Sequence, residues 1–123
     1  TKTQFRRLLE TDGIDIAQPD MMYSGGITEA RKIAAIADTF HVPISFHNTK
    51  GPIGILAAAH VEASIPNSAP MEFVTGIDWR DEIIDEPLNV EEGRLLVPTG
   101  PGLGVKLNME AVEAHRWRVG DPR

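Results

Sequence analysis

The clearest pattern along the chain is a helical spacing of apolar residues in three separate stretches. The first predicts a helix over residues 4–10 that ends before Gly13. The second predicts a helix over residues 29–40 with Thr28 as its N-cap, and the third a helix that Pro52 opens and that ends near residue 64. The apolar faces consist of Phe5, Leu8 and Leu9; of Ile33, Ile36, Ala37 and Phe40; and of Ile53, Leu56, Ala57, His60 and Val61.

Short apolar stretches alternate with these helices and predict strands. Residues 14–18 alternate apolar and polar positions and lead through Pro19 to Asp20, and residues 42–46 lead to His47. A third strand is expected over residues 71–75, where it presents Glu72. The predicted order is helix, strand, helix, strand, helix, strand.

The polar residues at these strands recur at nearly constant spacing. His47 follows Asp20 by 27 residues, and Glu72 follows His47 by 25. Each interval accommodates one βα unit, and repeated units of this kind give a parallel sheet with helices outside, as in a (β/α)₈ barrel or a doubly wound sheet. In both folds ligands bind at the carboxyl ends of the strands. Asp20, His47 and Glu72 are therefore expected on one rim.

The rest of the chain has a different pattern. Residues 78–86 are rich in acidic side chains and predict a solvated loop, with Trp79 and Trp117 as packing residues. Residues 89–97 are expected to form an extended excursion or hairpin, and residues 98–104 a glycine- and proline-rich turn. Asn108 is the expected cap of a final helix over residues 109–117.

Composition and charge narrow the range of functions. The chain has 123 residues, of which 41% are hydrophobic and 24% charged, and a net charge of −6. These values are typical of one globular domain, and the acidic balance argues against nucleic acid or membrane partners. The absence of cysteine excludes thiolate chemistry and disulfides. A soluble intracellular protein is the default expectation, and the start at Thr1 within an expected helix suggests a fragment.

Several segments together resemble a known family. Residues 14–20 (IDIAQPD), 25–29 (GGITE) and 47–54 (HNTKGPIG) are similar to barrel strands six and seven of the mandelate racemase subgroup of the enolase superfamily, and residues 101–105 (PGLGV) to its C-terminal tail. The resemblance implies strands six to eight of a (β/α)₈ TIM-type barrel with a C-terminal extension, so that residues 1–123 form the C-terminal part of the barrel domain. The N-terminal capping domain and the first strands would lie upstream.

The same resemblance implies roles for three residues. Asp20 and His47 would form the acid–base dyad, and Glu72 would bind the carboxylate of the substrate. His47 is thereby assigned both catalysis and substrate binding. The family's metal is Mg²⁺, held by acidic residues of strands three to five, so no metal ligand is expected in this chain. A homo-oligomer is also implied, and the default expectation of a soluble intracellular protein places it in the cytoplasm.

The family reaction removes a proton next to a carboxylate, which requires stabilisation of the resulting enediolate. A carboxylate bonded to one histidine nitrogen fixes the ring tautomer and favours the protonated form, so Asp20 would orient His47 for proton transfer. The resemblance to the sugar-acid dehydratases of this subgroup implies a Mg²⁺-dependent lyase that dehydrates a sugar acid of the aldonate type by eliminating a β-hydroxyl. A racemase or epimerase using the same dyad, and a non-catalytic barrel protein with a vestigial dyad, remain alternatives.

Other polar residues favour structural interpretations. Asn48 and Lys50 follow His47 and suit a turn, whereas His60 on an apolar helix face suits a hydrogen-bonded position in the core. His41 and His115 are expected at the surface or at helix ends. The glycine-rich residues 100–104 lack the sequence of a phosphate-binding loop. Because three strands leave the barrel open at both edges, the isolated segment is not expected to be stable alone.

Overall fold

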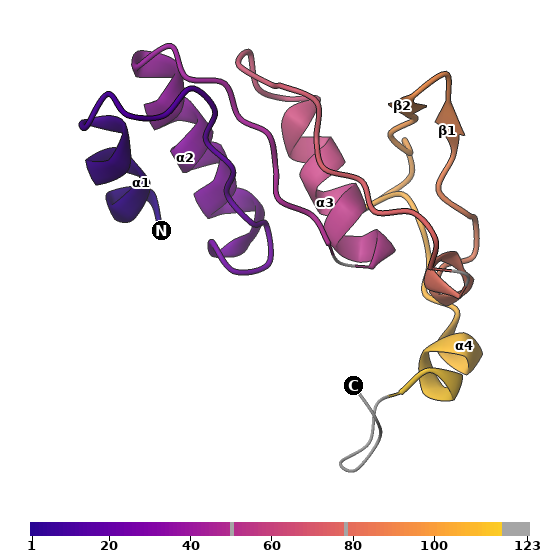
Figure 1. Cartoon of the computed structure of the whole chain (residues 1–123). Helices are drawn as coiled ribbons and strands as arrows, with labels where there is room; N and C mark the ends of the chain where they lie inside the picture. Colours follow the sequence, from indigo (N-terminus) through magenta and orange to yellow (C-terminus); the bar gives the residue numbers. More distant parts are fainter. Residues whose placement is uncertain (50, 78, 117–123) are drawn as a thin grey trace.

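The computed structural model describes residues 1–49, 51–77 and 79–116. Its helices are α1 (Lys2–Leu9), α2 (Gly26–Thr39), α3 (Pro52–Glu62) and α4 (Met109–Ala114). A 3₁₀ helix, η1, covers Arg80–Ile83, and the two strands are β1 (Val90–Glu91) and β2 (Arg94–Leu95). Figure 1 shows α1, α2 and α3 side by side with extended segments running along them, whereas α4 lies apart near the C-terminus.

Three extended segments lie parallel to one another and confirm the predicted βα repeat. Ala17 pairs with Ile44, Asp20 with His47, and Ile44 with Ser68, each as a parallel bridge. The Ala17 amide donates to the Pro43 carbonyl at 2.9 Å, and the Ser45 amide to the Ala17 carbonyl at 3.1 Å. The right topology is therefore present, with α2 and α3 as the connecting helices.

The three segments are not the continuous strands that the sequence predicts. Within the described residues they pair only through single bridges, and the third segment already pairs at Ser68, before the predicted start at Met71. Each segment contains a proline, at positions 19, 43 and 70, which removes one backbone donor. The prediction of extended parallel segments is correct, but the boundaries of the third strand are wrong.

Helix α2 begins earlier than its apolar pattern predicts. Thr28 is not the N-cap, because Gly25 caps a helix that starts at Gly26. Gly25 and Gly26 have φ angles of 108° and 76°, in the left-handed region where glycine has no steric penalty. The glycine pair thus turns the chain directly from the Asp20 loop into the helix. Of the predicted apolar face, Ile33 and Ala37 are buried, whereas Phe40 is 40% exposed.

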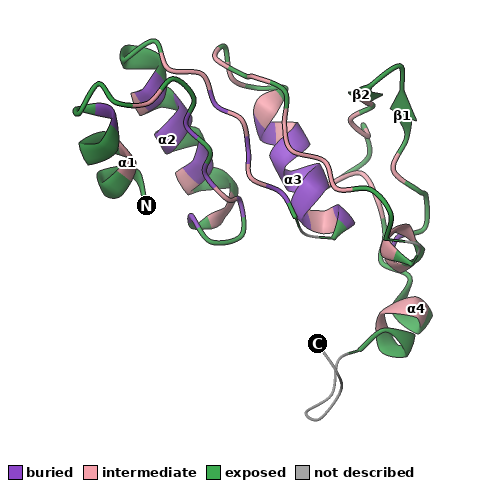
Figure 2. Cartoon of the chain, viewed as in Figure 1, coloured by how far each residue is buried: buried purple, intermediate pink, exposed green. Residues whose placement is uncertain are grey.

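The hydrophobic core lies between the parallel segments and the inner faces of the helices. Ile33, Ile44 and Phe46 are each 0% exposed. Helix α3 starts at Pro52 as predicted and buries eight of its 11 residues. Figure 2 shows buried residues concentrated on α2 and α3, with mostly exposed residues on α1, α4 and the hairpin. The packed part of the molecule is therefore the part that carries the strand ends.

The C-terminal part contains the predicted hairpin and capped helix. Strands β1 and β2 pair antiparallel, and the turn residues Glu92 and Gly93 have φ angles of 50° and 77°. Asn108 caps α4, because its Oδ1 accepts a hydrogen bond from the Ala111 amide at 3.3 Å. The expected acidic loop contains η1. The last helix ends at Ala114, so the predicted end at residue 117 is wrong; Trp117 itself lies outside the described residues. Across the described ranges, no helix has the length and apolarity to cross a membrane.

Candidate functional site

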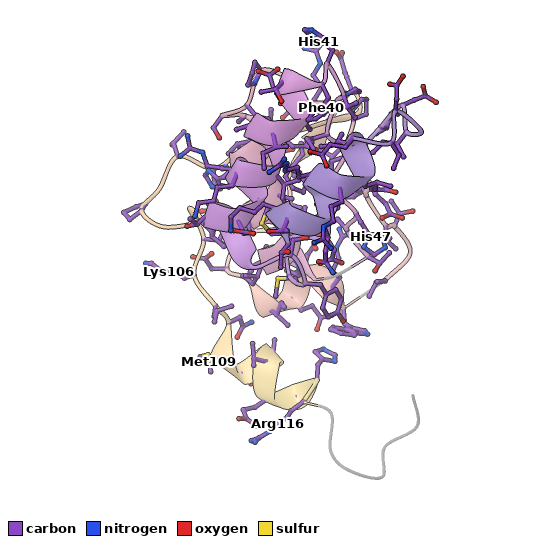
Figure 3. The ribbon with its side chains drawn as sticks, turned by 90° about the vertical axis from the view of Figure 1, so that its left-hand side faces the viewer. Phe40, His41, His47, Lys106, Met109 and Arg116 are labelled. Carbon is purple, nitrogen blue, oxygen red and sulfur yellow. The ribbon has the colours of Figure 1, made fainter. Side chains whose placement is uncertain are left out.

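Asp20 and His47 lie opposite each other at the carboxyl ends of the first two parallel segments. They form a register pair, and the His47 amide donates to the Pro19 carbonyl at 3.1 Å. The 27-residue interval in the sequence is thus the pairing offset of these two segments. In Figure 3 His47 lies between α4 and His41, which precedes the second segment and marks its amino end. The register alone brings Asp20 and His47 together.

The carboxylate of Asp20 is held from two sides. Its Oδ2 lies 2.8 Å from His47 Nδ1, and its Oδ1 accepts hydrogen bonds from the amides of Met22 at 2.8 Å and Tyr23 at 3.1 Å. Burial by itself raises the pKa of the Asp20 carboxyl, but the bonds from His47 and from the two amides outweigh it and hold this pKa below its usual value. Asp20 is therefore a fixed anion that orients the imidazole ring.

The second ring nitrogen of His47 faces Glu72. The distance from His47 Nε2 to Glu72 Oε2 is 3.7 Å, and the same oxygen accepts a hydrogen bond of 2.9 Å from the Asn48 amide. The side chains of His47 and Glu72 are 40% and 36% exposed, whereas that of Asp20 is 12% exposed. The structure thus brings all three predicted residues together, with the two outer groups open to a ligand. Their roles in catalysis stay predictions.

A bulge in the third segment accompanies the position of Glu72. The Ile44 carbonyl accepts from the Ala69 amide at 2.7 Å, but the Phe46 carbonyl accepts from the Glu72 amide at 3.2 Å. Three residues of the third segment thus match two of the second, which is one more than a regular parallel ladder has. Bulges of this kind redirect side chains near ligand sites. Here the inserted residue precedes Glu72, on the way to the rim.

Two residues of the site were not predicted from the sequence. Asn48 was expected in a turn, yet it is only 1% exposed, and its amide fixes Glu72. Glu62, at the end of α3, reaches the Phe46 amide with its Oε1 at 3.4 Å. No local pattern marks such long-range contacts, although an acidic residue beside Val61 on a largely apolar helix is an unusual feature of the sequence.

The other histidines have structural environments. His60 is partly buried, with Nε2 3.3 Å from the Leu103 carbonyl, in agreement with a hydrogen-bonded position against the core. His115 ends α4, stacks on Trp79 at a centroid distance of 4.6 Å, and lies 3.0 Å from Glu82. The predicted packing role of Trp79 thus takes the form of a half-exposed stack. Lys50, like Trp117, lies outside the described residues.

The described residues do not form a metal site. Within the described ranges there is no group of three or more histidine, aspartate or glutamate side chains that could hold a metal ion. Asp20 is engaged by His47 and two backbone amides, which leaves only two open groups on the rim, His47 and Glu72. Among the described residues the donor set therefore does not fit Mg²⁺, and the origin of the metal ligands stays a prediction.

Parallel βα units with polar residues at the carboxyl ends of their strands are shared by barrels and doubly wound sheets, and the similar solved structures identify this fold as the C-terminal part of a TIM-type barrel. The chain belongs to the enolase superfamily, since the family model described as "Enolase C-terminal domain-like" matches residues 1–112. This identification confirms the resemblance to the mandelate racemase subgroup.

Individual relatives support the same family. The chain is 41% identical over 111 residues to D-xylonate dehydratase of Haloferax volcanii, covering 89% of this chain and 27% of the relative. A mandelate racemase/muconate lactonizing enzyme-like protein from Rubrobacter xylanophilus has a TM-score of 0.90 at 32% identity, and the match covers 97% of this chain and 31% of that protein. The 3,6-anhydro-D-galactonate cycloisomerase of Zobellia galactanivorans has a TM-score of 0.82 at 38% identity, and the match covers 93% of this chain and 32% of that protein. The chain thus spans about a third or less of the length of these relatives.

Proposed function

We propose that the intact protein is a dehydratase of a sugar acid of the aldonate type. The observation that carries this proposal is the triad on the rim, in which His47 lies 2.8 Å from Asp20 and 3.7 Å from Glu72. The similarity to D-xylonate dehydratase supports the substrate class, because that relative acts on a sugar acid according to its name. The reaction is a lyase reaction that removes water.

His47 is the proposed acid and base. With Nδ1–H donated to Asp20, Nε2 carries the free lone pair and can take the proton from the carbon next to the substrate carboxylate. The electrons of the broken C–H bond form an enediolate. When the bond to the β-hydroxyl breaks, the protonated ring returns its proton to the departing oxygen, so that water leaves. The remaining enol becomes a 2-keto-3-deoxy acid.

Glu72 is the proposed contact for the substrate carboxylate. Its Oε2 lies close to Nε2 of His47, so a carboxylate bound there through a shared proton would place the adjacent carbon near the base. The Asn48 amide holds Glu72 in this position at 2.9 Å. Positioning of this kind turns proton transfer into an intramolecular step, which is a large part of the catalytic effect in enzymes.

The proposal extends to parts of the protein beyond the described residues. Mg²⁺ would be held by ligands outside the described residues and would stabilise the charge of the enediolate. An upstream capping domain with the first barrel strands would complete the pocket. Assembly as a homo-oligomer and a cytoplasmic location stay predictions.

The test is a product assay with the intact protein and Mg²⁺ on a panel of sugar acids. Formation of a 2-keto-3-deoxy acid from at least one aldonate is the expected result. Replacement of His47 by asparagine should abolish it, and a failure of the wild type on every acid in the panel would refute the proposal. The matched control is His41→Asn, at the opposite end of the same segment.

Two alternatives are distinguished by further measurements. A racemase or epimerase would exchange the proton next to the carboxylate with solvent deuterium and form no keto acid. The cycloisomerase among the similar structures shows that this family includes reactions other than dehydration. A non-catalytic barrel with a vestigial dyad would give neither product nor exchange, and His47→Asn would leave its properties unchanged.

A further inference from the structure

Among residues 44–47, the amide of Phe46 is the one that does not bond to the backbone of a neighbouring segment. The Ile44 amide donates to the Asn67 carbonyl at 2.8 Å, and the amides of Ser45 and His47 donate to the first segment. Phe46 is buried at 0% exposure, yet its amide donates to a side chain, Oε1 of Glu62, at 3.4 Å. A buried amide without a partner is costly, so this contact satisfies a definite need.

The bulge explains why the Phe46 amide needs a side-chain acceptor. In a regular continuation from the Ile44–Ser68 pair, this amide would bond to the carbonyl of Ala69. The inserted residue interrupts that pattern, and the adjacent Pro70 carbonyl instead accepts from Ser45 Oγ at 2.8 Å. The same bulge lets the Glu72 amide reach the Phe46 carbonyl. The amide and the carbonyl of Phe46 thus connect Glu62 to Glu72.

The side chain of Glu62 is partly buried in mostly apolar surroundings. It lies at the wall of a hollow of about 780 Å³, lined mostly by apolar side chains of α3, the third segment and the hairpin. Arg94 is the other charged residue of this wall, and within the described residues no cation lies at ion-pair distance from Glu62. Burial raises the pKa of Glu62 to about 7. The contact with the Phe46 amide is the polar interaction that the described structure shows for this carboxyl group.

We propose that Glu62 is a positioning residue that caps the Phe46 amide, stabilises the bulge, and thereby holds Glu72 at the distance from His47 that substrate binding requires. Glu62 touches no reacting atom and acts through the backbone from the outer helix layer. Its effect on turnover rests on the proposed function, whereas its effect on the backbone does not.

Amide hydrogen exchange in the intact protein tests the backbone part directly. Glu62→Ala removes the acceptor, so exchange of the Phe46 and Glu72 amides should rise about 10-fold, as expected for the loss of one hydrogen bond. Glu62→Gln keeps a carbonyl acceptor and should exchange like the wild type. The control Val61→Ala weakens the neighbouring core and should raise amide exchange at Ile33 and at Phe46 by similar factors. Equal exchange of Phe46 and Glu72 in Glu62→Ala and wild type would overturn the proposal.

Kinetics test the link to the site. Because Glu72 is the proposed substrate contact, Glu62→Ala should raise KM several-fold more than it lowers kcat, and Glu62→Gln should restore KM. Val61→Ala should leave KM unchanged. A normal KM in Glu62→Ala together with faster exchange would overturn the positioning role. If the wild type turns over no sugar acid but the exchange pattern is as expected, the proposed function fails and the capping of the bulge stands.

Discussion

Residues 14–72 and residues 79–116 differ sharply in how they are held. The first region contains α2, α3 and the three parallel segments, and nearly the whole core lies there. In the second region, among its described residues, only Ile84 is buried, and α4 buries none of its residues. The dyad and Glu72 belong to the first region. The difference teaches that the site is built on packed register contacts, whereas the C-terminal part is attached by partly buried contacts such as those of Leu103 with the core and with His60.

The largest expected effect is on catalysis and is confined to the packed region. His47→Asn in the intact enzyme should lower kcat by about 10²–10⁴-fold, because it removes the proposed acid and base. The free energy of unfolding should change little, since the side chain is 40% exposed. Initial rates and denaturant unfolding measure the two quantities. Turnover equal to that of wild type would remove His47 from the mechanism.

Core truncation tests the difference in packing between the regions. Ile33→Ala on α2, at 0% exposure, should lower the free energy of unfolding of the intact protein by about 2–5 kcal/mol. Met109→Ala on α4, at 59% exposure, should change it by less than about 0.5 kcal/mol. If urea unfolding showed equal losses of the free energy of unfolding in both variants, α4 would belong to the same cooperative core.

A smaller effect should appear in the pH dependence of stability. The pKa of Glu62 is raised from 4.5 to about 7 in the fold, so the folded state holds an extra proton between these values. Stability should therefore fall as the pH rises through this range, by on the order of 1 kcal/mol after allowance for partial exposure. Asp20 acts in the opposite direction, because its lowered pKa stabilises the fold above its usual value of 3.8 and this contribution is lost at lower pH.

Unfolding of wild type and Glu62→Gln at about pH 5 and about pH 8 measures the Glu62 contribution. Glutamine cannot ionise, so the variant should lose most of the fall in stability between these two values. An identical fall in both proteins would assign the pH dependence to other groups. Arg94, which faces the same hollow, is the control, because Arg94→Gln removes the nearby positive charge without removing the carboxyl.

The smallest effect concerns the C-terminal region. Asn108→Ala removes the cap of α4 and should destabilise that helix by about 1 kcal/mol. Amide exchange over residues 109–114 should therefore rise, while exchange in α2 and α3 stays unchanged. Asn89→Ala, which removes a side-chain contact in the hairpin region, is a suitable control for α4. Faster exchange in α3 as well would contradict the separation of the two regions.

Much of the fold could be predicted from the sequence because its signals are local. The apolar periods predicted α2 and α3, Pro52 predicted the start of α3, and the interval between Asp20 and His47 predicted that both lie on one rim. The start of α2 was wrong, since the glycine pair at 25 and 26 overrides the cap expected at Thr28. The periodic pattern shows where a helix runs, and backbone conformation decides where it begins.

The details around Glu72 could not be predicted, because they depend on contacts between distant parts of the chain. The bulge arises from the pairing of residues 44–46 with residues 67–72, and no local motif specifies the extra residue. Glu62 and Asn48 gain their roles only when α3 and the third segment meet the second. The sequence therefore indicates which residues reach the rim, and the packing determines how each is held there.

The central claim is that Asp20, His47 and Glu72 remove a proton next to a carboxylate. The most direct test is NMR of the reaction of the intact protein with an aldonate in deuterium oxide. The account predicts a 2-keto-3-deoxy acid that has lost the hydrogen at C2 and carries deuterium at C3, formed by wild type and not by His47→Asn. An aldonate that keeps its C2 hydrogen in the presence of wild-type protein, throughout the panel of acids, would contradict it.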